Sequence, residues 1–147
     1  MSAGGTYALL LHLDALRVVR VGALGELNFP SGWYLYLGSA LGPGGLAARL
    51  ARHKRHADKR LHWHIDYVRA VMRLVEVWTE PGETRQECAW AAAAAELPQA
   101  NIITPRLGAS DCRCPSHLYH CARRPQLEEF AAAIQTGLIR KIVDDGD

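Results

Sequence analysis

One stretch of the 147-residue chain, from Gly32 to His56, constrains the fold more than any other. Residues 33–37 alternate in character, so that Tyr34 and Tyr36 would share one face of a β-strand. A turn rich in glycine and proline follows, and a helix is expected to begin after Gly45. A strand, a tight turn and a basic helix in this order can direct a tyrosine hydroxyl and a guanidinium at one phosphate. The stretch therefore predicts a functional site where the strand meets the helix.

The expected helix is basic. Arg49, His53 and His56 recur at positions i, i+4 and i+7, and they therefore lie near one another on the helix surface. Six of the 17 Lys and Arg residues fall between Arg49 and Arg60, although the net charge of the chain is only +2. Such a cluster indicates an anionic partner better than the average charge does. The alternative is a solvated helix face, which is the usual role of a run of charges.

The composition is that of an ordinary soluble globular protein, with 49% apolar and 22% charged residues. The length predicts one domain, which can bury a core without disulfides or metal. No apolar run approaches the ~18 residues of a membrane span, and the N-terminus lacks the basic segment of a secretion signal. We therefore expect a cytoplasmic protein with no membrane partner, whose four cysteines are reduced.

Hydrophobic patterning predicts a mixture of strands and helices. Strands are expected at 6–13, 16–21, 33–37 and 74–79, with the second paired to the first. Helices are expected from residue 46 onward, at 62–69, from Thr84 as the N-cap to about Glu96, and at 126–135. The segments 22–32 and 97–110 are expected to be loops, and the C-terminal end is expected to be frayed.

The segment from Asp111 to Cys121 is too dense in cysteine and histidine for an ordinary loop. Cys112, Cys114 and His117 suggest a zinc site, and tetrahedral coordination requires a fourth ligand. The candidates for that ligand are His120, Cys121, His62 and His64. In the alternative interpretation, the cysteines pack as small apolar side chains and Asp111 caps a turn.

Two tripeptides, Gly5-Thr6-Tyr7 and Tyr36-Leu37-Gly38, together resemble the two signature motifs of the GIY-YIG nuclease family. In that family the motifs lie on consecutive strands of a small central sheet, and the helix after the second motif bears an arginine. The resemblance covers roughly residues 5–96. Two further stretches, HWHIDY and SDCRCPSHL, resemble a small prokaryotic GIY-YIG subgroup, in which a copy is sometimes fused to an endonuclease III-like glycosylase.

The resemblance implies an α+β fold with a small, mostly antiparallel central sheet flanked by helices. We expect a single GIY-YIG-like domain over residues 1–147. Its core would span about 5–96, and the Cys/His-rich segment and the last helix would follow in 97–147. The 28 residues between Tyr7 and Tyr36 exceed the usual short spacer of the family, which indicates an extra hairpin or loop at Leu16 to Pro30.

The function that the resemblance implies is hydrolysis of DNA phosphodiester bonds by a metal-dependent endonuclease, in DNA repair or in structure-selective processing. The catalytic residues would be Tyr7, Tyr36, Arg49, His53 and Glu87. Tyr7 would take the proton of the attacking water, and the site would have to lower the pKa of this tyrosine, through nearby Arg49 or through His53 as a proton acceptor. Glu87 would hold Mg²⁺ or Mn²⁺, with Glu83 as the rival ligand.

Further residues near the motifs are expected to contact the nucleic acid. Ser39 follows the second motif, where excision-repair members of the family carry a lysine. The other expected contacts, which would follow the phosphate backbone, are Arg52, Lys54, Arg55, His56, Lys59 and Arg60. DNA is the expected partner, and RNA remains open.

Two other functions remain open. A nucleic-acid-binding module without catalysis would keep the basic helix and bind DNA without cutting it. A structural or interaction protein stabilised by zinc would be centred on residues 112–121. The nuclease hypothesis requires Tyr7, Arg49 and Glu87 to converge on one cleft, whereas the zinc hypothesis requires one tightly held ion.

Overall fold

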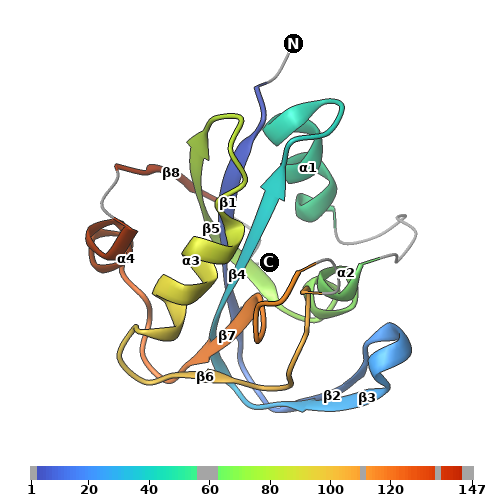
Figure 1. Ribbon diagram of the computed structural model, residues 1–147. Coiled ribbons are helices and arrows are strands. Elements are labelled where there is room, and N and C mark those ends of the chain that lie inside the picture. Colours follow the sequence, from blue (N-terminus) through green and yellow to red (C-terminus); the bar gives the residue numbers. More distant parts are fainter. Residues whose placement is uncertain (1–2, 56–62, 110–111, 135–136, 144–147) are drawn as a thin grey trace.

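The computed structural model describes residues 3–55, 63–109, 112–134 and 137–143, and it has a mixed α+β fold, as predicted (Figure 1). Its centre is a six-stranded antiparallel sheet in the order β6-β7-β4-β1-β5-β8. These strands are β1 (Gly5–Leu13), β4 (Gly32–Ala40), β5 (Arg73–Pro81), β6 (Ala100–Ile102), β7 (Leu118–Cys121) and β8 (Ile139–Ile142). The flanking helices are α1 (Gly45–Lys54), α2 (His64–Arg69), α3 (Glu87–Ala95) and α4 (Leu127–Ile134). Among the described residues, no helix combines the length and the apolar character that crossing a membrane requires.

The sheet has a hydrophobic core on each face, because successive side chains of a strand point in opposite directions. Leu9 and Leu11 of β1 pack with Leu46 of α1 and with the apolar side of α2. Ala8 and Leu10 pack on the opposite face, with residues of α3 and α4. Helices α1 and α2 therefore cover one face, and α3 and α4 cover the other (Figure 1).

The alternation predicted for residues 33–37 is confirmed in β4. Tyr34 and Tyr36 belong to the core beneath α1 and α2, whereas Leu35 and Leu37 belong to the core beneath α3 and α4. Trp33 packs against the second core as well. The side chains of Tyr34 and Tyr36 thus lie on the same side of the sheet as the basic helix α1.

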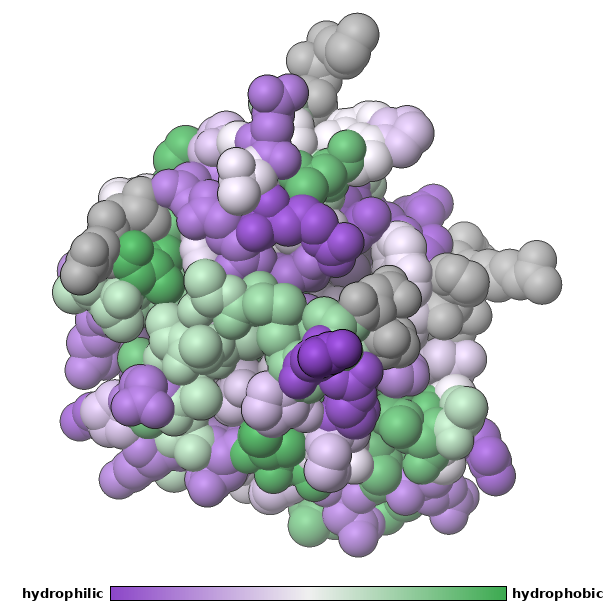
Figure 2. Space-filling model, viewed as in Figure 1, coloured by the Kyte–Doolittle hydropathy of each residue, from purple (hydrophilic) through white to green (hydrophobic). Residues whose placement is uncertain are grey.

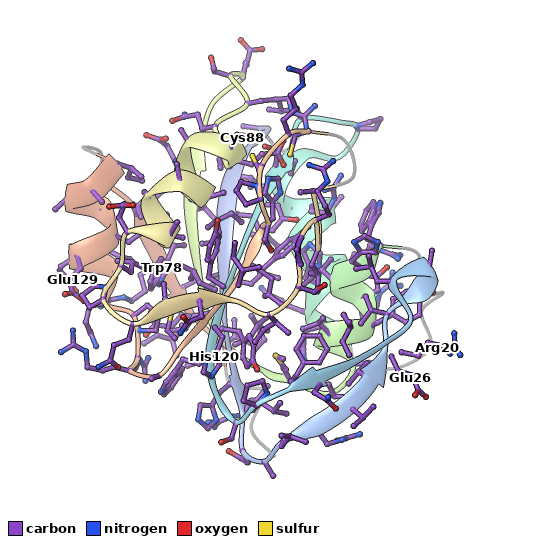
Figure 3. All side chains as sticks on the ribbon, turned by 60° about the horizontal axis from the view of Figure 1, so that its bottom comes forward. Arg20, Glu26, Trp78, Cys88, His120 and Glu129 are labelled. Carbon is purple, nitrogen blue, oxygen red and sulfur yellow. The ribbon has the colours of Figure 1, made fainter. Side chains whose placement is uncertain are left out.

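The predicted strand at 16–21 is present as β2 (Arg17–Arg20), but its predicted pairing with β1 is wrong. Both edges of β1 are already occupied by β4 and β5. β2 instead pairs with β3 (Glu26–Phe29), across the 3-10 turn η1 (Gly22–Leu24), in a separate two-stranded sheet. This is the extra hairpin that the long spacer predicted, and Arg20 and Glu26 point outward at its end (Figure 3).

Other elements also differ from the prediction, in type or in bounds. β6 lies in a predicted loop and β8 in the predicted frayed end, because both are short edge strands whose exposed residues lack a clear alternation. The helix predicted from Thr84 begins at Glu87, and Gln86 occupies the N-cap without a side-chain hydrogen bond. The predicted helix at 62–69 is present from His64, and His62 lies outside the described residues.

Arg69, which is fully buried, fixes the C-terminal end of α1. Its Nε donates a hydrogen bond to the His53 carbonyl oxygen at 2.7 Å, and Nη2 donates to the Lys54 carbonyl oxygen at 3.3 Å. Nη1 donates to the Met72 carbonyl oxygen at 2.8 Å. The last carbonyls of a helix have no partner within the helix, so this side chain supplies the donors that they need.

We predict that Arg69→Met lowers the free energy of urea unfolding by about 3 kcal/mol, because it leaves buried carbonyl groups without their donor. The matched control is Arg73→Met, which removes an exposed arginine at the start of β5 and should change that free energy by less than about 0.5 kcal/mol. Equal effects of the two substitutions would contradict this assignment.

Candidate functional site

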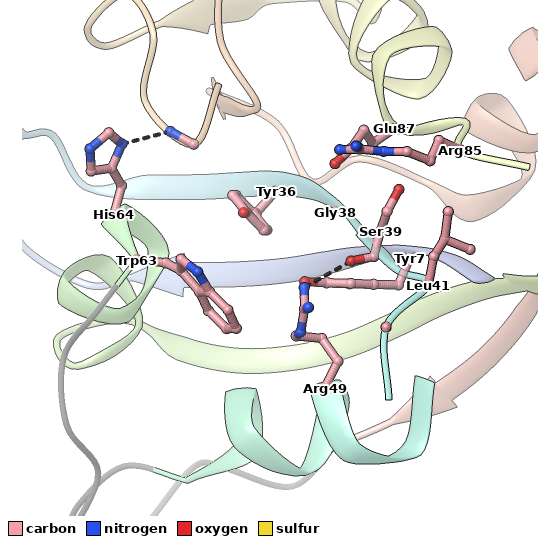
Figure 4. A pocket seen from close by; sticks show the side chains of 12 residues that line it. Tyr7, Tyr36, Gly38, Ser39, Leu41, Arg49, Trp63, His64, Arg85 and Glu87 are labelled. Atoms are coloured by element: carbon pink, nitrogen blue, oxygen red, sulfur yellow. Dashed lines mark hydrogen bonds and ion pairs between the residues drawn. The ribbon is translucent and has the colours of Figure 1, made fainter. Parts of the chain in front are cut away.

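A pocket of about 540 Å³ lies where the last residues of β4 meet the start of α1 (Figure 4). Five of the residues predicted for the site line it, and they come from the four elements β1, β4, α1 and α3: Tyr7, Tyr36, Ser39, Arg49 and Glu87. Hydrophilic residues gather on the upper surface of the molecule, above the paler band over α3 (Figure 2). The sequence positions that the two tripeptides and the basic helix singled out are thus brought to one polar cavity.

Tyr7 lies at the base of this pocket and is fully buried. A hydrogen bond of 2.6 Å joins its hydroxyl to Nε2 of His53, which is also buried, behind the pocket on α1. The two rings lie 5.3 Å apart, and the Tyr36 ring lies 6.5 Å from that of Tyr7. The described site therefore contains a tyrosine whose hydroxyl has a histidine nitrogen as its immediate neighbour.

The glycines of the two tripeptides make this arrangement possible. Gly38 lies opposite Tyr7 in the β1–β4 pairing, and a Cβ added there would come within 2.5 Å of the Tyr7 hydroxyl oxygen. At Gly5, an added Cβ would lie 2.6 Å from the Glu80 carbonyl oxygen and 2.7 Å from the Leu46 side chain. One glycine gives room to the tyrosine ring, and the other lets α1 approach the sheet closely.

Burial raises the pKa of Tyr7 from 10.0 to about 12, while the charge of Arg49 acts in the opposite direction. Burial also raises the pKa of Tyr36 well above its ordinary value, and neighbouring Tyr7 adds to the effect. Both phenols are therefore protonated near neutral pH in the protein alone. The surroundings were expected to lower the pKa of Tyr7, but they raise it. The raising effect of burial is larger than the lowering effect of the Arg49 charge.

The guanidinium groups of Arg49 and Arg52 both lie over the indole of Trp63. Their guanidinium carbons are 4.5 and 4.7 Å from the centre of the ring, within the range of a cation–π contact. Arg49 donates from Nη1 to the Ser39 carbonyl oxygen at 2.8 Å and lines the pocket. Arg52 forms an ion pair with the fully buried carboxylate of Asp66. The charge of Arg52 is thus neutralised by a carboxylate of the protein, whereas the guanidinium of Arg49 faces the cavity.

Glu87 opens α3 and reaches the pocket from the far side of the sheet. β7 makes this possible because it is short: its pairing with β4 ends at Tyr36 opposite Leu118, and the last residues of β4 continue past it. The carboxylate of Glu87 is mostly buried and accepts a hydrogen bond from Arg85 Nε at 2.8 Å. The Arg85 side chain is 60% exposed, so the acidic group is covered from the solvent side by a surface residue (Figure 4).

A loop closes the opposite end of the pocket. The backbone N–H of Gly108 donates to Nδ1 of His64 at 2.9 Å, which ties this loop to the start of α2 (Figure 4). Gly108 has a positive φ of 75°, and a Cβ there would lie 2.8 Å from the Tyr36 ring. Burial lowers the pKa of His64, which keeps this acceptor nitrogen unprotonated at neutral pH.

Cys112, Cys114 and His117 come together as predicted, and the fourth member of the group is Cys88 of α3. We call this group the Cys3His cluster. Its candidate ligand atoms all lie within 4.8 Å of one another, so it could hold a metal ion such as zinc. Burial lowers the pKa of His117, so its imidazole is in the neutral form that binds metals. Figure 3 shows Cys88 at the start of α3, facing the sulfur atoms of neighbouring side chains.

The fourth ligands suggested by the sequence are not part of the cluster as the structure describes it. His64 accepts the bond from Gly108, and His120 Nε2 is hydrogen-bonded to the Ser31 carbonyl oxygen at 3.0 Å. Cys121 is buried in β7. His62 and Asp111, which was expected to cap a turn, lie outside the described residues.

The residues of the basic segment that were predicted to contact nucleic acid are not gathered at the pocket, as far as the structure describes them. Lys54 lies beside Lys141 of β8, and this contact lowers the pKa of Lys54. Arg55 is exposed just after α1. His56, Lys59 and Arg60 lie outside the described residues.

Several residues were not predicted to have the positions that they take in the site, although His64 was a candidate zinc ligand. Arg85, Trp63 and His64 line the pocket, and Cys88 completes the cluster. The signal that the sequence did contain is their closeness, along the chain, to residues that were singled out. Arg85 and Cys88 flank the predicted Glu87, and Trp63 and His64 belong to the HWHIDY stretch. The rival ligand Glu83 is exposed and is not among the residues that line the pocket.

Comparison with known proteins gives one match. A family model described as "Domain of unknown function DUF123" matches residues 6–139. No curated protein and no solved structure matches the chain.

We predict that Gly38→Ala lowers the free energy of unfolding by about 1–3 kcal/mol and displaces the Tyr7 hydroxyl from His53, because the new methyl group has no space. The control is Gly42→Ala in the same pocket, where an added Cβ meets nothing within 4 Å. Urea unfolding measures the first effect, and the imidazole NMR signals of His53 report the second. Indistinguishable results for the two variants would contradict the packing argument.

Stability should fall at alkaline pH. The folded-state pKa of Tyr7 is about 12 and its unfolded value is 10.0, so the unfolded chain loses the proton first. This tyrosine therefore contributes about 3 kcal/mol that is fully present below pH 10 and is lost as the pH rises through about 12. The free energy of unfolding, measured from about pH 9 to 12, should decline less steeply in Tyr7→Phe; equal slopes would contradict the prediction.

Proposed function

The chain belongs to the DUF123 family, whose description assigns no function, and we propose that it is a divalent-metal-dependent endonuclease that hydrolyses DNA phosphodiester bonds. The observation that carries this proposal is the convergence of four side chains on one pocket from β1, β4, α1 and α3. They are Tyr7, Tyr36, Arg49 and Glu87. A proton acceptor, a fixed cation and a carboxylate are the groups that phosphodiester hydrolysis needs.

Packing alone does not account for this set. The same core could be filled by phenylalanines, yet β1 and β4 each place a tyrosine at the pocket, and each tripeptide keeps a glycine where a side chain would clash. The Tyr7 hydroxyl is directed to His53 rather than to solvent. These features support a chemical role for the hydroxyl.

Glu87 would hold a divalent cation, for which Mg²⁺ and Mn²⁺ are the fitting candidates. Its carboxylate lines a polar cavity large enough for a hydrated ion and a phosphate, and Mg²⁺ is commonly bound by one or two carboxylates together with substrate oxygens. Arg85, being largely exposed, can turn toward solvent or toward a phosphate when the carboxylate is engaged. When bound, the ion would supply stabilisation of the charge on the phosphoryl and leaving oxygens.

Arg49 would bind the phosphate. Its hydrogen bond to the Ser39 carbonyl and its contact with Trp63 hold the guanidinium in place before substrate arrives. A planar, permanently charged fork suits the oxygens of a phosphodiester. Preorganised charge of this kind stabilises a transition state because no reorganisation is needed during the reaction.

Tyr7 would act with His53 as a proton relay. With a pKa of about 12, the phenol is protonated at neutral pH, so it is not a phenolate base before the reaction begins. It can instead pass its proton to His53 Nε2, 2.6 Å away, while it accepts one from the attacking water. Tyr36, whose hydroxyl side faces the same cavity, would orient that water or the phosphate.

The ion pair between Arg85 and Glu87 supports a second candidate, a nucleic-acid-binding module without catalysis. If that pair persists with DNA bound, the carboxylate stays neutralised by protein and the pocket serves only to hold a phosphate. This candidate predicts salt-dependent binding of DNA without cleavage.

The test is cleavage of labelled single-stranded, duplex, nicked, flap and four-way DNA and of RNA, with Mg²⁺ or Mn²⁺. We expect Glu87→Gln and Arg49→Ala each to lower the cleavage rate by a factor of about 100 or more, since each removes stabilisation of the transition state. Glu83→Gln, which alters an exposed carboxylate outside the pocket, is the control and should cut like the parent.

The outcomes separate the candidates. Glu87→Gln cutting as fast as the parent would refute the metal-ligand role. Absence of cutting, with salt-sensitive binding retained, would favour the binding module. Cleavage that also requires the Tyr7 hydroxyl, tested by Tyr7→Phe, would support the proton relay.

A further inference from the structure

The Cys3His cluster lies directly beside the pocket, because Cys88 is the residue after Glu87 at the start of α3. The geometry points to a single tetrahedral Zn²⁺ at this cluster, which clamps the start of α3 to the loop over Tyr36 and so fixes the carboxylate of Glu87. The zinc site itself is independent of the proposed nuclease activity. Only the consequence for Glu87 rests on that proposal.

The distances fit one ion. His117 Nε2 lies 3.4 Å from Cys112 Sγ and 3.9 Å from Cys88 Sγ. In a tetrahedral site with Zn–S bonds of about 2.3 Å, neighbouring ligand atoms are about 3.7 Å apart. The remaining separations stay within 4.8 Å, a spread that one ion can close with small side-chain rotations. Three thiols and an imidazole are soft and borderline donors, which favour Zn²⁺ over Mg²⁺ or Ca²⁺.

The backbone around the cluster is already arranged for a fixed site. The N–H of His117 donates to the Leu107 carbonyl at 2.9 Å, and the N–H of Arg106 donates to the Pro115 carbonyl at 2.6 Å. The N–H of Leu37 in β4 donates to the His117 carbonyl at 3.0 Å. His117 is therefore held against the central sheet before a metal binds, as in a structural site.

The ion would join α3 to the segment 112–117, where Cys88 Sγ and His117 Nε2 already lie 3.9 Å apart. Cys88 belongs to α3, on one face of the sheet, while the segment 112–117 holds the loop whose Gly108 lies against Tyr36. A four-coordinate ion between them fixes the first turn of α3 relative to that loop. The first residue of this turn is Glu87, so the position of the pocket carboxylate depends on the clamp.

The experiment measures metal content in the purified full-length protein by elemental analysis. We expect one zinc per chain in the parent and in Cys121→Ala, the control that removes the cysteine outside the cluster. Cys112→Ser and Cys88→Ser should bind zinc at least about tenfold more weakly, as measured by competition with a chromogenic chelator. Absence of zinc from the parent, iron in its place, or unchanged affinity in both serine variants would overturn the assignment.

Cobalt provides a measurement that needs no variant. Metal-free parent protein titrated with Co²⁺ should develop the visible d–d bands of tetrahedral coordination, with thiolate charge-transfer bands, at one equivalent. Bands of octahedral coordination would overturn the Cys3His assignment.

Hydrogen exchange tests the clamp. Removing zinc should speed exchange of amides in 88–91, 106–109 and 112–117, and should leave the hairpin formed by β2 and β3 unchanged. Equal protection with and without zinc would overturn the clamp. Neither readout needs activity: zinc bound without cleavage would refute only the nuclease proposal, and cleavage without zinc would refute only the clamp.

Discussion

The contact between the Tyr7 ring and Gly38 is the constraint on which the rest of the site depends. It exists because β1 and β4 are antiparallel neighbours that place these two residues opposite each other. The glycine leaves the space into which the ring turns, and this direction brings the hydroxyl to His53 on α1. Helix α1 can lie close enough for that bond because Gly5 also lacks a side chain. Two small residues in the sheet thus determine where a helix packs and what its histidine meets.

The pocket uses side chains from both faces of the sheet. Tyr7 and Arg49 come from the face covered by α1 and α2, whereas Glu87 comes from α3 on the other face. A continuous sheet would separate them. Because β7 ends its pairing at Tyr36, the edge of β4 beyond that point is available for α3 to approach. The short length of one edge strand is therefore what allows a carboxylate and a guanidinium to share a cavity.

Features that depend on local pattern could be predicted from the sequence, and features that depend on distant pairing could not. Alternation located β4, and the glycine turn located α1, since both signals lie within a few residues. The partner of β2 was assigned wrongly because both edges of β1 are occupied by β4 and β5, which come later in the chain than β2. Cys88 was missed for the same reason: it lies in the first turn of an alanine-rich helix, far from Cys112 in the sequence, and the packing of α3 brings it to the cluster.

The charges around Trp63 explain how Arg49 and Arg52 can lie close together while only Arg49 faces the pocket. Both guanidinium groups contact the same indole, and their mutual repulsion would be costly in a half-buried site. The buried carboxylate of Asp66 neutralises the charge of Arg52. The same carboxylate accepts a hydrogen bond from the backbone N–H of Trp63 at 2.9 Å. Arg52 and Asp66 therefore fix the indole on which Arg49 rests. The permanent charge of Arg49 is left directed at the cavity.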